Sequence, residues 1–187
     1  TVVIKDNVCI AGVPMTHGSS IIDGFIPEFD APIITKMLDA GATIVGKSHC
    51  ENLCISGGSH TNFRGPQLNP YDVTRTSGGS SSGTAILLST KEVDFGIGGD
   101  QGGSIRIPSA FCGVCGMKAT HGLIDYTGIF GLEPTVDHVG PMTRTVSENI
   151  TLFQVLADKK ISINPTLKNF RIGLLKEGFQ HPNLSEA

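Results

Sequence analysis

The sequence lacks several features that define whole classes of proteins. It has no tryptophan, only 17% charged residues, and no apolar run close to the roughly 18 residues that a membrane-spanning helix needs. Its 24 glycines follow no Gly-X-Y period, which excludes a collagen triple helix. A net charge of −3 with scattered basic residues provides no footprint for nucleic acid. The sequence therefore predicts neither a membrane partner nor a nucleic-acid partner.

What the chain does contain is enough apolar material for a packed core. Hydrophobic residues fill 39% of the 187 positions, and glycine is about twice as frequent as usual. Such a chain is long enough for one domain. Its five cysteines are an odd number without a secretory signal, which favours reduced thiols and a cytoplasmic location. We expect a soluble protein with many unusual backbone positions.

Short strands and helices are predicted to alternate along the chain. Strands are expected at residues 1–5, 42–45, 93–97, 114–118 and 170–175, and helices at 32–40, 82–89, 104–112 and from 146 onward. Asp30 is expected to cap the first helix, and Thr145 and Glu148 to form a capping box for the last. The apolar face of the last helix is expected to be Val146, Ile150, Phe153 and Leu156. This order predicts a layered α/β sheet.

Two glycine–serine turns carry most of the chemistry that the sequence suggests. They are Gly78-Gly-Ser-Ser-Ser-Gly83 and Gly99-Asp-Gln-Gly-Gly-Ser104, and each leads into a predicted helix. Successive backbone N–H groups at a helix start attract negative charge, so such a turn can hold a phosphate or a transient oxyanion. A serine at its end favours the oxyanion. The alternative is that both turns are only capped helix starts.

Three rival sites compete with these turns. The run Gly79-Ser-Ser-Ser-Gly83 has the form of a nucleophile elbow around Ser81, but the polar residues before it do not form the required strand. A phosphate-binding P-loop would need a lysine after Gly83. The spacings Cys50-x3-Cys54 and Cys112-x2-Cys115 suggest zinc or a redox pair, but neither lies in a knuckle-like turn. We therefore expect no metal and no cofactor.

A serine nucleophile needs a base to take its proton, and the residue pattern leaves that base open. No local context selects one of the histidines at positions 17, 49, 60, 121, 138 and 181. Lys47, which follows an apolar strand and Gly46, could serve on pattern alone.

Taken together, the motifs resemble the amidase signature family. The resemblance rests on Val3-Ile-Lys-Asp-Asn7, Thr76–Gly83 and Gly98–Pro108, with further matches at Gly46-Lys47, 111–118 and 137–142. The intervals of 75 residues from Lys5 to Ser80 and of 24 from Ser80 to Ser104 agree with the family's spacing. Details such as Asp137-His138 resemble the broad-range amidases found beside nitrile-hydrating enzymes.

The resemblance implies a role for each matching residue. Ser104 would be the acyl-forming nucleophile, Ser80 the bridging serine after a cis peptide bond, and Lys5 the base. The oxyanion hole would be the backbone amides of Gln101, Gly102, Gly103 and Ser104. A lysine base must be neutral, and the apolar start of the strand around Lys5 suits that need. Lys47 is then interpreted as structural, while Asp100 and Arg106 are expected to fix the loop by hydrogen bonds.

The implied activity is the hydrolysis of a carboxamide to a carboxylate and ammonia through an acyl-enzyme. Two alternatives stay open: a glutamine-hydrolysing subunit of an amidotransferase, and a non-catalytic binding remnant.

The implied fold is α/β with a mixed β-sheet layered between helices. We expect residues 1–187 to be a fragment of one such domain, with a catalytic core at 1–158 and a C-terminal extension at 159–187, and with little activity by itself. Its expected partner is a small-molecule amide, and the resemblance allows a homodimer.

Overall fold

A five-stranded mixed sheet forms the centre of the molecule in the computed structural model, which describes residues 1–162, 171–180 and 182. Its strands are β1 (Val2–Lys5), β2 (Ile44–Ser48), β3 (Phe95–Asp100), β4 (Cys115–Gly116) and β5 (His138–Thr143). They lie in the order β2-β1-β3-β5-β4. Strand β1 runs parallel to β2 and β3, whereas β5 is antiparallel to β3 and β4.

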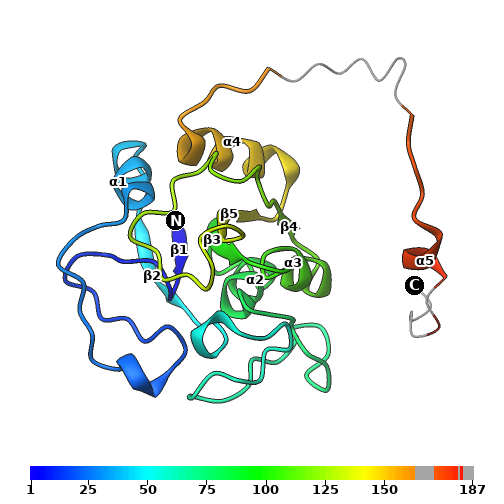
Figure 1. Ribbon diagram of the computed structural model, residues 1–187, viewed down its shortest axis with the longest axis horizontal. Helices are drawn as coiled ribbons and strands as arrows, with labels where there is room; N and C mark the ends of the chain where they lie inside the picture. Colours follow the sequence, from blue (N-terminus) through cyan, green and yellow to red (C-terminus); the bar gives the residue numbers. More distant parts are fainter. Residues whose placement is uncertain (163–170, 181, 183–187) are drawn as a thin grey trace.

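Helices cover both faces of this sheet, as Figure 1 shows. They are α1 (Pro32–Asp39), α2 (Ser82–Ser89), α3 (Arg106–Cys112) and α4 (Val146–Ala157), followed by the exposed α5 (Lys176–Phe179), with short 3-10 turns at Ser20–Ile22 and Asn52–Cys54. Helices α1 and α4 pack on one face, and α2 and α3 on the other. Within the described ranges, no helix combines the length and the apolar character needed to cross a bilayer.

Alternation along β1 divides its side chains between the two faces. Val2 and Ile4 are buried in the cluster that includes α1 and α4, while Val3 belongs to the cluster of α2 and α3. Because successive strand residues point to opposite faces, Lys5 points to the same face as Val3. The strand therefore directs this lysine toward α2 and α3, where the two glycine–serine turns begin their helices.

Most of the predicted elements form, although their ends shift. The strands expected at 42–45 and 93–97 are β2 and β3, displaced toward the carboxyl side because pairing with β1 sets their limits. Strand β5 was not predicted, because the glycine and proline in its sequence are unfavourable in strands. It forms through its antiparallel pairing with β3. The capping box of Thr145 and Glu148 at α4 is confirmed.

One prediction about helices is wrong, and another is confirmed only in part. The N-cap of α1 is Ala31 and not Asp30, whose carboxylate instead accepts a hydrogen bond from the backbone nitrogen of Ala11 at 2.7 Å. Val146 is 66% exposed and does not join the apolar face of α4. Phe153 and Leu156 are buried as predicted, whereas Ile150 is only partly buried, and the buried face of α4 also includes Asn149, Leu152 and Ala157.

The strand expected at 170–175 is also wrong where the structure describes it. Residue 170 lies outside the described residues, and residues 171–175 have no regular structure. A strand needs a hydrogen-bonded neighbour, and none of the described strands pairs with this segment. Its apolar side chains are accordingly exposed, as with Ile172 at 86%.

Replacing Gly83 with alanine tests how closely α2 packs on the segment after β2. A Cβ at Gly83 would lie 2.6 Å from the backbone nitrogen of His49, which cannot move aside cheaply. We expect Gly83→Ala to lower the free energy of unfolding by about 1–3 kcal/mol, although alanine is the better helix former. Urea unfolding followed by circular dichroism measures this change.

Gly46→Ala is the matched control, because a Cβ at that position in β2 would meet no atom within 4 Å. We expect it to change the free energy of unfolding by less than about 0.5 kcal/mol. Equal losses at Gly46 and Gly83 would contradict the packing argument.

Candidate active site

Lys5 is fully buried at the end of β1, yet its amine has polar partners. Its Nζ donates to Ser80 Oγ at 2.7 Å and to the Gly99 carbonyl oxygen at 3.3 Å. Burying such a polar group without partners is costly, so these two bonds explain how the strand can end on lysine. The fold thus brings together the residues that the resemblance assigns as base and bridging serine.

The peptide bond between Gly79 and Ser80 is cis, the form that the resemblance implies at this place. Backbone hydrogen bonds hold it on both sides. The Gly79 nitrogen donates to the Gly57 carbonyl oxygen at 2.9 Å, and the Glu51 nitrogen donates to the Ser80 carbonyl oxygen at 3.2 Å. Ser80 itself is fully buried.

Ser104 lies between β3 and α3 and is 8% exposed. Its carbonyl oxygen accepts a hydrogen bond from the Ser81 nitrogen at 3.1 Å, which holds the two glycine–serine turns side by side. The Ser81 hydroxyl is engaged with the Gly99 backbone, donating to its oxygen and accepting from its nitrogen, each at 3.2 Å. That engagement argues against Ser81 as the nucleophile of an elbow.

A buried carboxylate shapes the turn that precedes Ser104. Asp100 Oδ1 accepts from the Gly103 nitrogen at 2.8 Å, and Oδ2 accepts from the Ile105 nitrogen at 3.1 Å. Arg106 adds two side-chain bonds to the same carboxylate, of 3.0 and 2.9 Å. Gly103 has a φ of +131°, which a side chain would strain. Asp100 and Arg106 therefore fix this turn by hydrogen bonds, as the sequence predicted.

The same bonds set the charge on Asp100. Burial alone would raise the pKa of this carboxyl, but the bonds from Arg106 and from the Ile105 and Gly103 nitrogens outweigh burial and hold the pKa below its ordinary value. The Gly103 N–H is thus committed to a charged carboxylate. Of the four amides that the resemblance assigns to an oxyanion hole, those of Gln101, Gly102 and Ser104 make no hydrogen bond to another described residue.

Lys47, the competing lysine, has different partners. Its Nζ donates to the Val8 carbonyl oxygen and lies 3.4 Å from an Asp6 carboxylate oxygen. Burial lowers the pKa of Lys47, and the charge on Asp6 opposes that shift. These contacts join β2 to the segment after β1, so Lys47 supports the fold around Lys5.

The described histidines make contacts away from the two serines. His17 Nε2 lies 3.1 Å from Cys54 Sγ, and His138 Nε2 lies 3.1 Å from Lys118 Nζ. None of the described histidines bonds to Ser80 or Ser104, and His181 lies outside the described residues.

All five cysteines are free. Burial raises the pKa of the Cys112 thiol to about 11. In the part of the chain that the structure describes, no group of three or more His, Cys, Asp or Glu side chains could hold a metal ion.

A network of amide and hydroxyl groups beside this site was not predicted from the sequence. The Phe130 carbonyl oxygen accepts from Asn7 Nδ2 at 3.0 Å and from the Tyr126 hydroxyl at 3.3 Å. Gln101 Nε2 in turn donates to the Tyr126 oxygen at 3.1 Å. Burial raises the pKa of Tyr126, so its hydroxyl keeps its proton. Asn7 and Phe130 are 123 positions apart, so no local spacing reveals the network.

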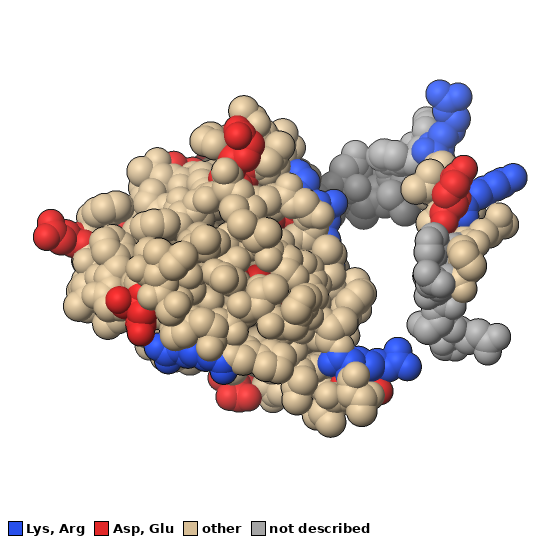
Figure 2. Space-filling view, turned by 60° about the horizontal axis from the view of Figure 1, so that its bottom comes forward, with Lys and Arg blue, Asp and Glu red and all other residues tan. Residues whose placement is uncertain are grey.

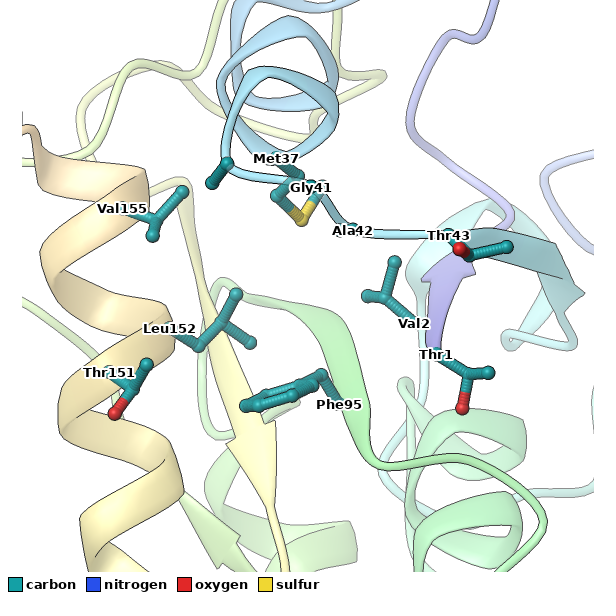
Figure 3. Close-up of a pocket in the computed structure, with 11 residues that line it drawn as sticks. Thr1, Val2, Met37, Gly41, Ala42, Thr43, Phe95, Thr151, Leu152 and Val155 are labelled. Atoms are coloured by element: carbon teal, nitrogen blue, oxygen red, sulfur yellow. The ribbon is translucent and has the colours of Figure 1, made fainter.

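A cavity of about 230 Å³ lies at the end of β1 opposite to Lys5 (Figure 3). Val2, Met37, Phe95, Leu152 and Val155 project into it from the sheet and from α1 and α4. No ionisable side chain lines it, so it lacks the groups that acid–base chemistry needs.

On the molecular face in Figure 2, charged side chains are scattered and form no continuous basic patch.

Comparisons with known proteins find relatives along the whole chain. A family model described as Amidase matches residues 1–183. The chain is 53% identical to an enantioselective amidase of Rhodococcus rhodochrous over 159 residues, which cover 84% of this chain and 30% of that protein. It is 36% identical to the A subunit of glutamyl-tRNA(Gln) amidotransferase from Methanosarcina acetivorans over 203 residues, which cover 100% of this chain and 43% of that protein.

Solved structures with the same fold include two proteins of these kinds. The A subunit of glutamyl-tRNA(Gln) amidotransferase from Thermotoga maritima has a TM-score of 0.81 at 35% identity, with 83% of this chain and 34% of that chain covered. The peptide amidase of Stenotrophomonas maltophilia has a TM-score of 0.80 at 31% identity, with 85% and 34% covered. The chain thus spans about a third of each solved structure. By its sequence and its fold, the chain belongs to the amidase signature family.

Proposed function

We propose that this chain carries the catalytic centre of an amidohydrolase that cleaves a carboxamide to a carboxylate and ammonia. The observation that carries the proposal is the buried hydrogen bond from Lys5 to Ser80, beside the turn that ends in Ser104. Family membership and the likeness to an enantioselective amidase support amide hydrolysis. Because the chain spans less than half of those relatives, the activity is proposed for the intact protein, with residues 1–158 as its catalytic core and 159–187 as an extension.

In the proposed acylation, Ser104 Oγ attacks the carbonyl carbon of the substrate. The Ser104 proton passes to Ser80 Oγ while the Ser80 proton passes to the neutral Lys5 amine. A C–O bond forms, and the carbonyl electron pair moves onto oxygen to give a tetrahedral oxyanion. The backbone N–H groups of Gln101, Gly102 and Ser104 would stabilise this charge, since aligned donors act strongly where water is excluded.

Collapse of the intermediate reverses the proton path. The oxyanion electron pair re-forms the C=O bond as the C–N bond breaks, and the departing nitrogen takes its proton from Ser80 Oγ. The Lys5 ammonium then returns a proton to Ser80. Water attacks the remaining Ser104 ester through the same relay, which releases the carboxylic acid and restores the Ser104 hydroxyl.

The surroundings of Lys5 suit this cycle. A lysine base must be available as a free amine, and a carboxylate partner would favour the ammonium form instead. None of the ion pairs among the described residues includes Lys5. Its partners are a hydroxyl that can relay a proton and a backbone carbonyl that can orient the amine.

A second candidate function is a glutamine-hydrolysing subunit that passes ammonia to a partner protein. The likeness to the A subunit of glutamyl-tRNA(Gln) amidotransferase, over the full length of this chain, favours it.

A screen of aliphatic, aromatic and amino-acid amides separates the two functions in the intact protein. Hydrolysis of several amides supports the amidase, whereas hydrolysis of glutamine alone together with a co-purifying partner supports the amidotransferase role. Light scattering on the same sample tests the proposed homodimer.

Substitution of the proposed nucleophile and base tests the mechanism directly. We expect Ser104→Ala to abolish ammonia release from the amide that the intact protein hydrolyses fastest, and Lys5→Ala to lower kcat/KM by several orders of magnitude. Lys47→Met is the control lysine variant, because Lys47 does not contact Ser80, and we expect it to retain kcat/KM within about tenfold. Normal hydrolysis by Ser104→Ala would refute the assignment of the nucleophile.

A fluorophosphonate probe distinguishes an enzyme from a non-catalytic remnant. The probe labels only an activated hydroxyl, so we expect mass spectrometry of the labelled intact protein to find it on Ser104. The Ser81 hydroxyl, which is engaged with Gly99, should stay unlabelled. An unlabelled Ser104 in the intact protein would favour the remnant.

The lowered pKa of Asp100 predicts how stability depends on pH. A carboxylate with a lowered folded pKa stabilises the fold above its unfolded pKa, about 3.9, and this contribution is lost as pH falls through the folded value. We therefore expect the free energy of unfolding to fall more steeply below about pH 4 in the wild type than in Asp100→Asn. Urea unfolding between about pH 3 and pH 7 measures both curves.

Asp39→Asn, at the exposed end of α1, is the control and should follow the wild-type curve. Parallel curves for the wild type and Asp100→Asn would contradict the assignment of this pH dependence to Asp100.

A further inference from the structure

Two buried amide oxygens beside the proposed catalytic residues have no donor among the described residues. They are Asn7 Oδ1 and Gln101 Oε1. Asn7 is fully buried, two residues after Lys5, and Gln101 begins the turn that ends in Ser104. Nearly all buried acceptors in folded proteins are paired with protein groups, water or a ligand, so these two oxygens are candidates to accept hydrogen bonds from a bound substrate.

The Phe130 carbonyl oxygen determines how both amides are oriented. It accepts from Asn7 Nδ2 and from the Tyr126 hydroxyl, so the Tyr126 proton is already used. The Tyr126 oxygen can therefore only accept, and it does so from Gln101 Nε2. Turning the Asn7 amide over would place Oδ1 against the Phe130 carbonyl oxygen, and turning the Gln101 amide over would require the Tyr126 hydroxyl to give up its bond to Phe130. Both side-chain oxygens are thus directed away from the network.

The position of Asn7 relative to Lys5 follows from their shared neighbour. A Cβ built on Gly99 would lie 3.4 Å from Asn7 Nδ2 and 3.4 Å from Lys5 Nζ. Gly99 and Gln101 lie on either side of Asp100, on the turn that presents the N–H groups of the proposed oxyanion hole. The Asn7 amide therefore lies beside the amine of the proposed proton relay, and Gln101 belongs to the turn that leads to Ser104.

We propose that Asn7 Oδ1 and Gln101 Oε1 accept the two N–H bonds of the leaving nitrogen in an unsubstituted carboxamide. This inference rests on the proposed amide hydrolysis and adds the two side chains that would recognise its leaving group. An ester has no N–H, and an N-alkyl amide has one fewer. When the C–N bond breaks, the nitrogen takes its new proton from Ser80 through its lone pair, and two held N–H bonds would direct that lone pair toward Ser80 Oγ.

The test compares a primary amide with the methyl ester of the same acid, in the intact protein. The acid is the one whose amide is hydrolysed fastest in the screen above. Gln101→Met keeps the backbone N–H and a side chain of similar length but removes the acceptor, and Asn7→Leu does the same at the other position. We expect each variant to lower the ratio of kcat/KM for the amide to kcat/KM for the ester roughly 10- to 100-fold, because only the amide loses hydrogen bonds to the substituted side chain.

Asn69→Leu is the matched control for loss of a buried amide. Asn69 Nδ2 donates to the Thr76 and Phe111 carbonyl oxygens, and Oδ1 accepts from the Tyr71 nitrogen, so this amide has partners at both ends. We expect Asn69→Leu to change kcat/KM for amide and ester by the same factor, because its role is structural.

Tyr126→Phe adds an intermediate case. It removes the hydroxyl that orients Gln101 but keeps both acceptors, so we expect a smaller fall in the amide-to-ester ratio.

Gln101→Met is the decisive variant if Asn7→Leu does not fold, because Gln101 is only partly buried and its substitution should leave the fold intact. An unchanged amide-to-ester ratio in Gln101→Met would overturn the inference, since the acceptors would then bind only water. If the wild type hydrolyses neither substrate, the proposed function fails and the inference falls with it.

Discussion

The burial of the Lys5 amine is the constraint on which the rest of the structure depends. A buried amine must find acceptors, and its two partners belong to different glycine–serine turns, Ser80 to the first and Gly99 to the second. Helices α2 and α3 must therefore start beside the end of β1. The strand order β2-β1-β3 meets this requirement, because it places the end of β3, and with it the turn to Ser104, next to Lys5.

The parts of the fold that could be predicted are those determined by local sequence. Helix α2 was predicted with its observed bounds because an apolar run stands between two polar turns, and the Thr145 capping box needs only residues within one turn. Asp30 could not be placed correctly, because its carboxylate bonds to the distant Ala11. Strand β5 exists through its neighbour β3 and has no strand signal in its own residues.

The candidate site, too, could be predicted from the sequence only in part. The spacing of Lys5, Ser80 and Ser104 could be recognised in the sequence, because the motif residues are contiguous around each of them. The commitment of the Gly103 N–H to Asp100 could not, because it depends on the conformation of the turn. The hydrogen-bond network of Asn7, Gln101 and Tyr126 could not be predicted either. Its shared acceptor is the Phe130 backbone carbonyl, which any residue type at position 130 would supply.

The use of the Phe130 backbone carbonyl as the shared acceptor also has an evolutionary consequence. The Phe130 side chain does not orient the amides; its ring packs edge-on against His17 and Phe25, and so holds the loop in place. Mutation at position 130 can therefore change the ring while descendants inherit the same pair of acceptors, provided that the loop backbone stays where it is. A displacement of that backbone would instead move both acceptors in a single step, so the proposed recognition of the leaving group would be gained or lost as one heritable unit.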